Sequence, residues 1–108
     1  MSRLQFLYLT THGWKSGKEH TIEIWFVEHN KRYYIISERP DSAHWVQNIK
    51  HNSKVSFSTN NDNVFKGTAR IVDQEKESWL AGEVSKLMNT KYNWSQGLIV
   101  EVTPMNST

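Results

Sequence analysis

The sequence predicts a mainly β domain of the α+β class, in which six antiparallel strands close into a small barrel and two helices plug or flank it. Two observations predict this class. Six short segments alternate in polarity or are rich in β-branched and aromatic residues, and most of them follow one another through short turns. Two other segments have the period of an amphipathic helix. The 108 residues are enough for one hydrophobic core, so a single domain is expected over residues 1–108.

The first three predicted strands are joined by two loops. Residues 4–10 are apolar and rich in β-formers, and a basic loop ends them. Residues 21–27 (TIEIWFV) alternate between apolar and polar side chains, as a half-buried strand does. A His-Asn-Lys turn leads to residues 32–37 (RYYIIS). This last segment has so little polar content that we expect it to be covered on both faces.

A helix is predicted next, over residues 41–51. Trp45, Asn48 and Ile49 fall at i, i+3 and i+4, and therefore on one helical face. An Asp-Ser pair at the start of this segment can supply the N-cap. Residues 55–58 and 64–72 then form a second predicted hairpin around an Asn-rich turn.

The second helix is predicted over residues 74–89, with Asp73 as its cap. A loop over residues 90–96 precedes a last strand, residues 97–102, which Pro104 ends. The residues expected to form the buried stripe of this helix are Trp79, Leu80, Val84, Leu87 and Met88.

Composition and charge exclude several classes of protein. The net charge of +2 lacks the clustered excess of a dedicated nucleic-acid binder, so no nucleic-acid partner is expected. A small barrel that holds single-stranded nucleic acid by stacking remains a rival interpretation. The chain has no cysteine, which excludes disulfides and thiolate metal sites. No secretion signal or membrane span is visible, and we expect a soluble cytoplasmic protein.

The loop THGWKSGK carries more donors than a turn between two strands needs. Lys15, Ser16, Gly17 and Lys18 can present ammonium groups, a hydroxyl and backbone N–H groups to one phosphate or carboxylate. His20 begins the next strand and can add a donor when protonated. The alternative is an ordinary solvated turn, where Lys, Ser and Gly are common.

Two further groups of residues are candidates for a binding site. A buried amide must find hydrogen-bond partners, so Asn48 either faces a polar heterocyclic ligand or bonds a neighbouring strand. Trp45 on the same face is more typical of a core residue than of a ligand stack. Tyr92 and Trp94, in the loop before the last strand, either line a substrate mouth or cover the core.

Several chemistries are discounted. The five histidines show no metal-type pairing on a shared element, so no metal site is expected. The chain has no Gly-x-Ser-x-Gly elbow of a serine hydrolase and no close carboxylate pair of a glycosidase. If the protein is an enzyme, a bound cofactor is expected to supply the difficult chemistry.

The segments LTTHGWKSGKEHTIEI, RYYIIS, SAHWVQNIKHNSKVSF and FKGTARIVDQEKESWL, in this order, resemble the deazaflavin (F420)-dependent nitroreductase family. This family lies within the FMN-binding split-barrel superfamily of pyridoxamine 5'-phosphate oxidase relatives. The resemblance covers nearly the whole chain. It implies a six-stranded antiparallel split β-barrel with two helices. It also implies an oxidoreductase that transfers hydride from a reduced deazaflavin to a quinone or nitro compound, and a homodimer.

The resemblance also implies roles for individual residues. Tyr92 and Trp94 correspond to aromatic residues at the substrate mouth, and Tyr92 is a candidate proton donor, with solvent as the alternative. The cofactor-binding residues implied for the phosphate and acidic tail are Lys15, Ser16, Gly17, Lys18 and His20. Those implied for the ring are Ile36, Ser37, Trp45, Asn48 and Ile49.

The chain departs from the family pattern at three positions. Trp14 and His20 stand where arginines are common, and Glu38 occupies a position that is often basic. These changes remove up to three cations from the side that binds the tail. FMN, whose single phosphate needs fewer cations, is therefore the alternative cofactor. In that case the protein is an FMN-binding split barrel, either a flavin reductase or a flavin carrier.

Overall fold

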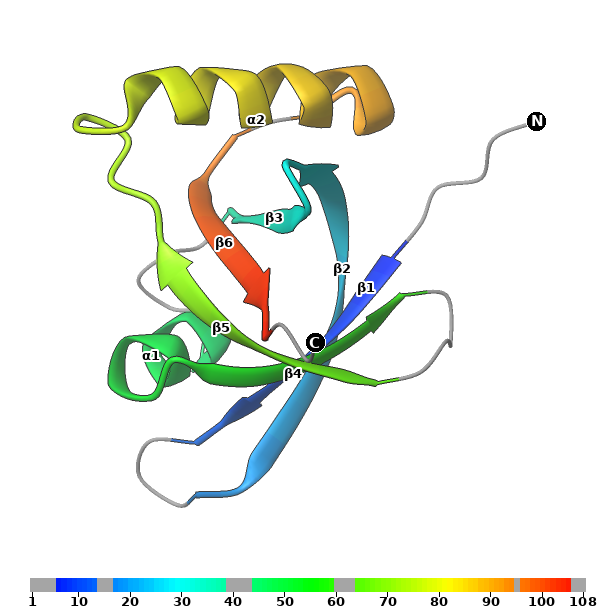
Figure 1. Ribbon diagram of the computed structural model, residues 1–108, viewed down its shortest axis with the longest axis vertical. Coiled ribbons are helices and arrows are strands. Elements are labelled where there is room, and N and C mark those ends of the chain that lie inside the picture. Colours follow the sequence, from blue (N-terminus) through cyan, green and yellow to red (C-terminus); the bar gives the residue numbers. More distant parts are fainter. Residues whose placement is uncertain (1–5, 14–16, 39–43, 60–63, 95, 106–108) are drawn as a thin grey trace.

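The protein is a closed six-stranded antiparallel barrel with two helices, as the sequence predicts (Figure 1). The computed structural model describes residues 6–13, 17–38, 44–59, 64–94 and 96–105. The strands are β1 (Phe6–His12), β2 (Glu19–His29), β3 (Arg32–Ser37), β4 (Lys54–Thr59), β5 (Phe65–Ile71) and β6 (Leu98–Pro104). The helices are α1 (His44–His51) and α2 (Ser78–Tyr92).

The order of the strands around the barrel is β1-β2-β3-β6-β5-β4, and β4 pairs with β1 to close it. Each neighbouring pair is antiparallel. Asn30 and Lys31, in the turn between β2 and β3, both have positive φ angles, of 52° and 64°. Two such residues in succession form the type of turn whose twist matches a tight hairpin. The predicted strand at residues 32–37 has the same bounds as β3.

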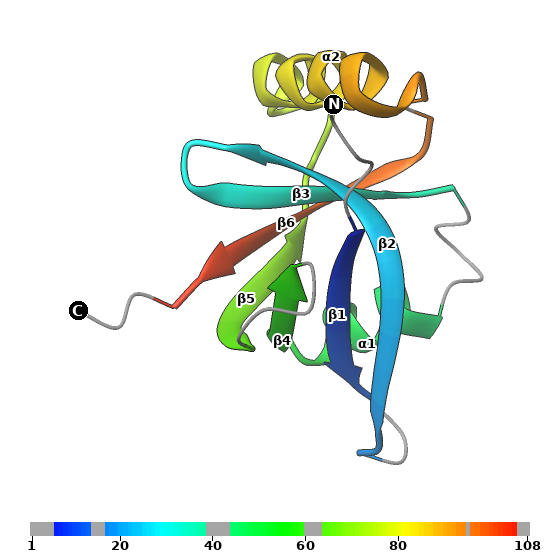
Figure 2. The same cartoon turned by 90° about the vertical axis from the view of Figure 1, so that its right-hand side faces the viewer.

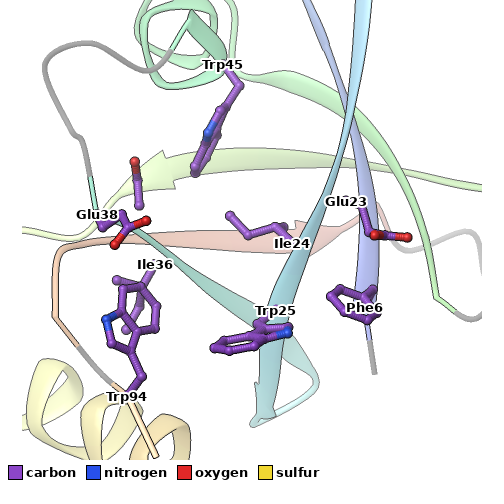
Figure 3. A pocket seen from close by; sticks show the side chains of 9 residues that line it. Phe6, Glu23, Ile24, Trp25, Ile36, Glu38, Trp45 and Trp94 are labelled. Atoms are coloured by element: carbon purple, nitrogen blue, oxygen red, sulfur yellow. The ribbon is translucent and has the colours of Figure 1, made fainter. Parts of the chain in front are cut away.

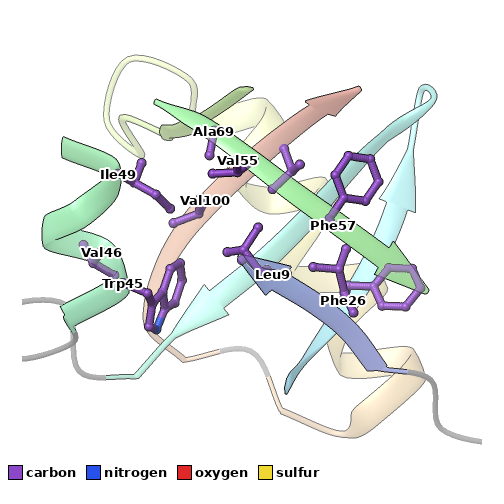
Figure 4. Close-up of a cluster of buried hydrophobic side chains, with 12 residues drawn as sticks. Leu9, Phe26, Trp45, Val46, Ile49, Val55, Phe57, Ala69 and Val100 are labelled. Atoms are coloured by element: carbon purple, nitrogen blue, oxygen red, sulfur yellow. The ribbon is translucent and has the colours of Figure 1, made fainter. Parts of the chain in front are cut away.

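Helix α1 closes one end of the barrel, and its apolar face continues the barrel interior (Figure 4). Trp45, Val46 and Ile49 join one buried cluster with inward-facing strand residues such as Leu9 and Val100. The predicted helix begins in residues 39–43, whose placement lies outside the described residues. Its predicted inward face is nevertheless confirmed, since Trp45, Asn48 and Ile49 are all buried.

Helix α2 lies across the outside of the barrel on the opposite side from α1 (Figures 1 and 2). It forms a second buried cluster in which Val84 and Met88 contact residues of β2, β3 and β6. Strand β3 belongs to both clusters, because Ile35 faces the barrel interior while Tyr34 and Ile36 face α2. The expectation that this strand is covered on both faces is therefore confirmed.

The bounds predicted for α2 are wrong at both ends. The helix begins at Ser78, because the preceding residues form a turn in which the Asp73 carboxylate accepts hydrogen bonds from the backbone N–H groups of Glu75 and Lys76. It continues to Tyr92, where Asn93 ends it in the left-handed conformation with φ of 57°.

The predicted buried stripe of α2 is also partly wrong, since Trp79 is 69% exposed. Its place in the stripe is taken by Ala81 and Tyr92, both buried.

The barrel has a split between β2 and β3. These strands pair only from Phe26 opposite Ile35 to His29 opposite Arg32. The first part of β2, from Glu19 to Trp25, pairs with β1 on one side and has no strand partner on the β3 side among the described strands. The two strands therefore diverge and leave a gap that side chains line.

Candidate functional site

A hollow lies at this split, and four of its nine described lining residues are aromatic (Figure 3). Its volume is about 600 Å³. Its lining residues are Phe6, Glu23, Ile24, Trp25, Ile36, Ser37, Glu38, Trp45 and Trp94. We call this hollow the tryptophan pocket. Three tryptophans from three separate segments around one concavity suit a flat, apolar ligand.

One wall of the pocket, Trp25, is held in place by the end of α2. The Trp25 ring stacks on the ring of Tyr92, with centroids 4.6 Å apart and planes at 5°. Trp94 contacts Trp25 edge-on, at 6.2 Å and 69°. The next residue of β2, Phe26, accepts hydrogen bonds at its carbonyl oxygen from the Tyr92 hydroxyl and from Lys91 Nζ, each at 2.9 Å. The end of α2 therefore holds β2 at the point where the split begins.

Tyr92, predicted to lie in a loop, is the last residue of α2 and is not among the described residues that line the tryptophan pocket. Its side chain is buried, and the hydroxyl also accepts a hydrogen bond from the Phe26 N–H at 3.2 Å. Burial raises the pKa of this phenol. The physical reason is the length of α2, which extends to Tyr92 and carries this ring onto the strand instead of leaving it in a loop. Trp94, by contrast, lines the pocket, and its place at a substrate mouth stays a prediction.

The opposite wall comes from the end of β3. Ile36 and Ser37, predicted to contact the cofactor ring, line the pocket, and the contact with a ring stays a prediction. Gly97 packs tightly behind them, with φ of +135°, and a Cβ atom at this position would overlap the Ser37 carbonyl oxygen. Glycine is thus required here for the chain to approach the end of β3.

A second hollow, of about 360 Å³, lies beside the basic loop. It is lined by His12, Gly13, Gly17, His51, Asn52 and Lys54. The loop is closed by hydrogen bonds from the Gly13 N–H to the Lys18 carbonyl and from the Gly17 N–H to the Gly13 carbonyl, each at 2.7 Å. Gly17 has φ of +74°, in the region that favours glycine. We call this the basic hollow, because Lys54 and two histidines border it.

Lys15 and Ser16 lie outside the described residues, so their predicted roles stay predictions. Lys18 is exposed next to Gly17. Gly17 is the one predicted anion-binding residue that lines the basic hollow among those that the structure describes.

A third hollow, of about 370 Å³, adjoins the tryptophan pocket. Its lining residues are His20, Thr21, Ile22, His44 and Trp45. Because Trp45 also lines the tryptophan pocket, the two hollows share a wall. His20, predicted to bind the anionic part of the cofactor, thus lines the hollow that adjoins the tryptophan pocket. His44 lines the same hollow.

Asn48 and Ile49 do not line any of these three hollows. Asn48 is 4% exposed, and its Nδ2 donates a hydrogen bond to Thr11 Oγ1 on β1 at 3.0 Å. Ile49 packs in the barrel core. Asn48 therefore bonds a neighbouring strand, which is the second of the two alternatives given for it. This hydrogen bond goes to a side chain of the strand. These residues fix α1, and with it Trp45, against the barrel.

The ionisable side chains of the tryptophan pocket are both acidic. Glu23 and Glu38 are exposed, and among the described residues no lysine, arginine or histidine lines the pocket. Glu23 faces Tyr8 across the β1–β2 ladder. The hydrogen bond between the Tyr8 hydroxyl and the Glu23 carboxylate raises the pKa of Tyr8.

A different set of charges surrounds Glu101, a buried glutamate in β6. Its carboxylate accepts hydrogen bonds from the Tyr34 hydroxyl at 2.7 Å and from Arg70 Nε at 2.8 Å, and Arg32 lies 3.7 Å away. Arg70 also forms two hydrogen bonds with Glu77, at 2.7 and 2.8 Å. Burial would raise the pKa of Glu101, but the hydrogen bonds from Arg70 and Tyr34 outweigh it and lower this pKa.

Sequence reasoning missed Trp25, Glu23 and the Glu101 cluster. Trp25 lies within an ordinary alternating strand pattern, which gives no sign of a binding site. It lines the pocket because β2 and β3 diverge next to it. Glu101 did leave a signal, because a glutamate between Val100 and Val102 in a buried strand needs a cationic partner.

Among the described residues, no group of three His, Asp or Glu side chains could hold a metal ion. Neither α1 nor α2 is long and apolar enough to cross a bilayer.

Comparisons with known proteins extend these observations. A structure of an F420-H2 dependent reductase (FDR-A) is 29% identical, with a TM-score of 0.64 over 90% of this chain and 91% of that one. Another solved structure, described as a domain-swapped dimer, is 30% identical, with a TM-score of 0.64 over 94% of this chain and 81% of the other.

A putative pyridoxamine 5'-phosphate oxidase from Listeria innocua is 16% identical, with a TM-score of 0.65 over 94% of this chain and 84% of that one. At this identity the likeness shows a shared fold. No curated protein matches the sequence.

A family model gives the assignment. Residues 1–102, nearly the whole chain, match the model of the F420H(2)-dependent quinone reductase. This match confirms the resemblance to deazaflavin-dependent enzymes and supports coenzyme F420 as the cofactor. The barrel, the pocket at its split and the family match agree, and the chain belongs to the F420H(2)-dependent quinone reductase family.

Proposed function

We propose that this protein binds reduced F420 in the tryptophan pocket and reduces a quinone or nitro-type acceptor there by hydride transfer. The observation that carries the proposal is the pocket at the barrel split, which shares Trp45 with a histidine-bordered hollow near the basic loop. One chain thus offers an apolar place for a flat ring and polar places for an anionic substituent.

The lining of the tryptophan pocket fits a planar ring. Trp25, Trp45 and Trp94 supply flat apolar surfaces, and the end of β3 supplies Ile36 and the Ser37 hydroxyl as the floor and a polar contact. Aromatic rings stack on such surfaces without needing a particular pattern of substituents. We assign these five residues to the ring.

The anionic part of the cofactor is assigned to the side of the molecule where cations gather. His20 and His44 border the hollow next to Trp45, and His12, His51 and Lys54 border the basic hollow. Lysine ammonium groups and backbone N–H groups near glycine are common phosphate ligands. The predicted residues Lys15, Ser16, Gly17 and Lys18 belong to the same loop.

The chain's own contribution to the reaction is binding, orientation and exclusion of water. The cofactor supplies the hydride when it is bound. Trp25 and Trp45 restrict the ring to one orientation, and their apolar surfaces exclude water from its faces. The Tyr92 hydroxyl both donates to and accepts from Phe26, so we assign it to positioning β2. Solvent at the open rim is the proton source that we propose.

The experiment is a tryptophan-fluorescence titration with oxidised F420, followed by anaerobic oxidation of reduced F420 with and without a quinone. Saturable quenching and acceptor-dependent oxidation are expected. Lys54→Gln removes a charge at the basic hollow and is expected to weaken F420 binding about tenfold, the size of one charge-assisted hydrogen bond. Lys86→Gln makes the same charge change on the exposed face of α2 and is the control. Unchanged affinity in Lys54→Gln would remove the assignment of the basic hollow.

FMN is the second candidate cofactor, and its support is that the described chain offers few cations near the pocket. The same titration with FMN separates the two candidates. Quenching by FMN alone would place the protein among flavin reductases or flavin carriers.

A homodimer is proposed as the functional assembly. Its support is the similar structure described as a domain-swapped dimer and the exposure of four large apolar side chains. These side chains are Val64, Phe65, Trp79 and Met105. Light scattering after size-exclusion chromatography measures the mass directly, and a monomeric mass would remove this proposal. The single domain over residues 1–108 and a cytoplasmic location stay predictions.

A further inference from the structure

The acidic side chains of the tryptophan pocket point to the class of acceptor that it takes. We propose that Glu38, assisted by Glu23, makes the pocket selective for flat acceptors without negative charge. This inference rests on the proposed function, because only that function makes the bound molecule an electron acceptor. The selectivity for charge is a property of the pocket and can be measured without any cofactor.

The first support is the composition of the lining. Seven of the nine lining residues are uncharged, and the other two, Glu23 and Glu38, are acidic. A glutamate carries a negative charge at neutral pH. The three tryptophan rings also present electron-rich faces, which attract cations and repel anions. The charges and the rings therefore act in the same direction.

The second support is the placement of the two carboxylates. Figure 3 shows Glu38 beside the space between Trp45 and Trp94, and Glu23 at the opposite edge beside Phe6. A flat molecule between the tryptophans lies closer to Glu38. We therefore assign the larger effect to Glu38.

The third support is that Glu23 is held in place. It lies opposite Tyr8 in the β1–β2 ladder, and the hydroxyl of Tyr8 is hydrogen-bonded to its carboxylate. Side chains two apart on a strand point to the same face, so Glu23 shares the face of Trp25, which the end of α2 fixes. Its carboxylate thus lies on the same side of β2 as this pocket wall.

The histidines nearby do not cancel this effect within the pocket. His20 and His44 border the adjoining hollow and do not appear in the lining of the tryptophan pocket. An anionic group of a ligand is therefore accepted in the adjoining hollow and disfavoured between the tryptophans. This division lets one protein hold an anionic cofactor and still exclude anionic acceptors.

The test uses three anthraquinones that differ in one substituent, namely a neutral hydroxymethyl, an anionic sulfonate and a cationic trimethylammoniomethyl group. Each is titrated into the cofactor-free protein, and tryptophan quenching gives its dissociation constant. The chain has no cysteine, so quinone addition to thiols does not disturb the titration. We expect the sulfonate to bind at least about fivefold more weakly than the neutral compound, and the cation at least as tightly, at low salt.

The variants are Glu38→Gln, Glu23→Gln and the control Glu75→Gln, which removes one negative charge outside the pocket. Glu38→Gln is expected to reduce the discrimination against the sulfonate to about twofold, Glu23→Gln to reduce it less, and Glu75→Gln to leave it unchanged. Equal affinities of the three compounds for the unmodified protein would overturn the inference. The same shift in Glu75→Gln as in Glu38→Gln would also overturn it, because overall charge would then be the cause.

A second set of titrations at saturating F420 separates this inference from the proposed function. If F420 fails to bind while the anthraquinones are still discriminated, the proposed function fails and the selectivity stands. If F420 binds and supports turnover while the three acceptors react and bind equally, the proposed function stands and the selectivity is overturned.

Discussion

Glu101 lies in β6, and Glu38 directly follows the neighbouring strand β3, but the surroundings of the two carboxylates are opposite. Glu101 is 3% exposed and is bonded to Tyr34 and Arg70. Glu38 is exposed at the rim of a pocket in which Glu23 is the other charged residue among the described lining residues. A buried charge is tolerated only when partners replace its water, whereas a charge at an open rim keeps its water and acts on whatever enters. The first serves the fold, and the second is available to a ligand.

The largest expected effect comes from neutralising the buried carboxylate. Glu101→Gln leaves Arg70 and Arg32 without their shared anion, and we expect the free energy of unfolding to fall by about 2–3 kcal/mol, less than for a fully buried pair because both arginines reach solvent. Urea denaturation measures this change. Glu77→Gln, at the exposed end of the same cluster, is expected to cost about 1 kcal/mol or less. Equal losses in the two variants would remove the distinction between buried and exposed carboxylates.

A second prediction concerns the hydroxyl that holds β2 at the split. Tyr92→Phe keeps the ring on Trp25 but removes two hydrogen bonds with the Phe26 backbone, so we expect a loss of about 1–2 kcal/mol in unfolding free energy. The rate of hydride transfer is expected to stay within about threefold of the unmodified protein. A fall of about a hundredfold, typical of a lost proton donor, would instead support the catalytic role predicted from the sequence.

The pH dependence of stability gives a third test of the Glu101 cluster. The pKa of Glu101 is lowered in the folded protein, so its contribution is fully present above the pKa of the unfolded state and is lost as pH falls through the folded pKa. Urea midpoints between pH 7 and pH 3 are expected to fall in the acid range. The difference between the unmodified protein and Glu101→Gln should narrow over the same range. A constant difference down to pH 3 would contradict this assignment.

The smallest expected effect on stability comes from the pocket carboxylate. Glu38→Gln is expected to change the free energy of unfolding by less than about 0.5 kcal/mol, because an exposed side chain with no partner in the lining loses little. The same denaturation series measures it. A loss above about 1 kcal/mol would show that Glu38 stabilises the fold, and the contrast drawn with Glu101 would then be wrong.

The fold was predictable from the sequence because its signals are local. Alternation, turn residues and the apolar segment RYYIIS predict the strands, and β3 has the predicted bounds. The start of α2 was not predictable in this way. Asp73 accepts backbone hydrogen bonds as a helix cap would, but the residues that donate them form a turn. Glu77, just before the helix begins, pairs with Arg70. The pairing of Glu77 with Arg70 in β5 thus lies just before the helix, and the residues around Asp73 alone do not predict it.

The candidate site was only partly predictable, for a related reason. Ile36, Ser37, Trp45 and Trp94, which the sequence singles out as candidate site residues, lie around one pocket, while their predicted roles stay predictions. Tyr92 was placed in a loop, although Val84, Met88 and Tyr92 repeat every four residues, which is the signal that α2 continues. Trp25 and Glu23 became pocket residues only because β2 and β3 diverge, and the point of divergence is set by register across the barrel. No local pattern encodes that register.

The unpaired side of β2 between Glu19 and Trp25 has a consequence for the solution behaviour of the protein. An open strand edge is a template on which another chain can add a strand, and proteins usually protect such edges with charged side chains. Here Glu19, His20 and Glu23 occur along that edge, and a ligand in the neighbouring hollows would shield it further. The opening beside the proposed ligand site is therefore also an edge at which cofactor-free chains are expected to associate, and bound cofactor is expected to cover it.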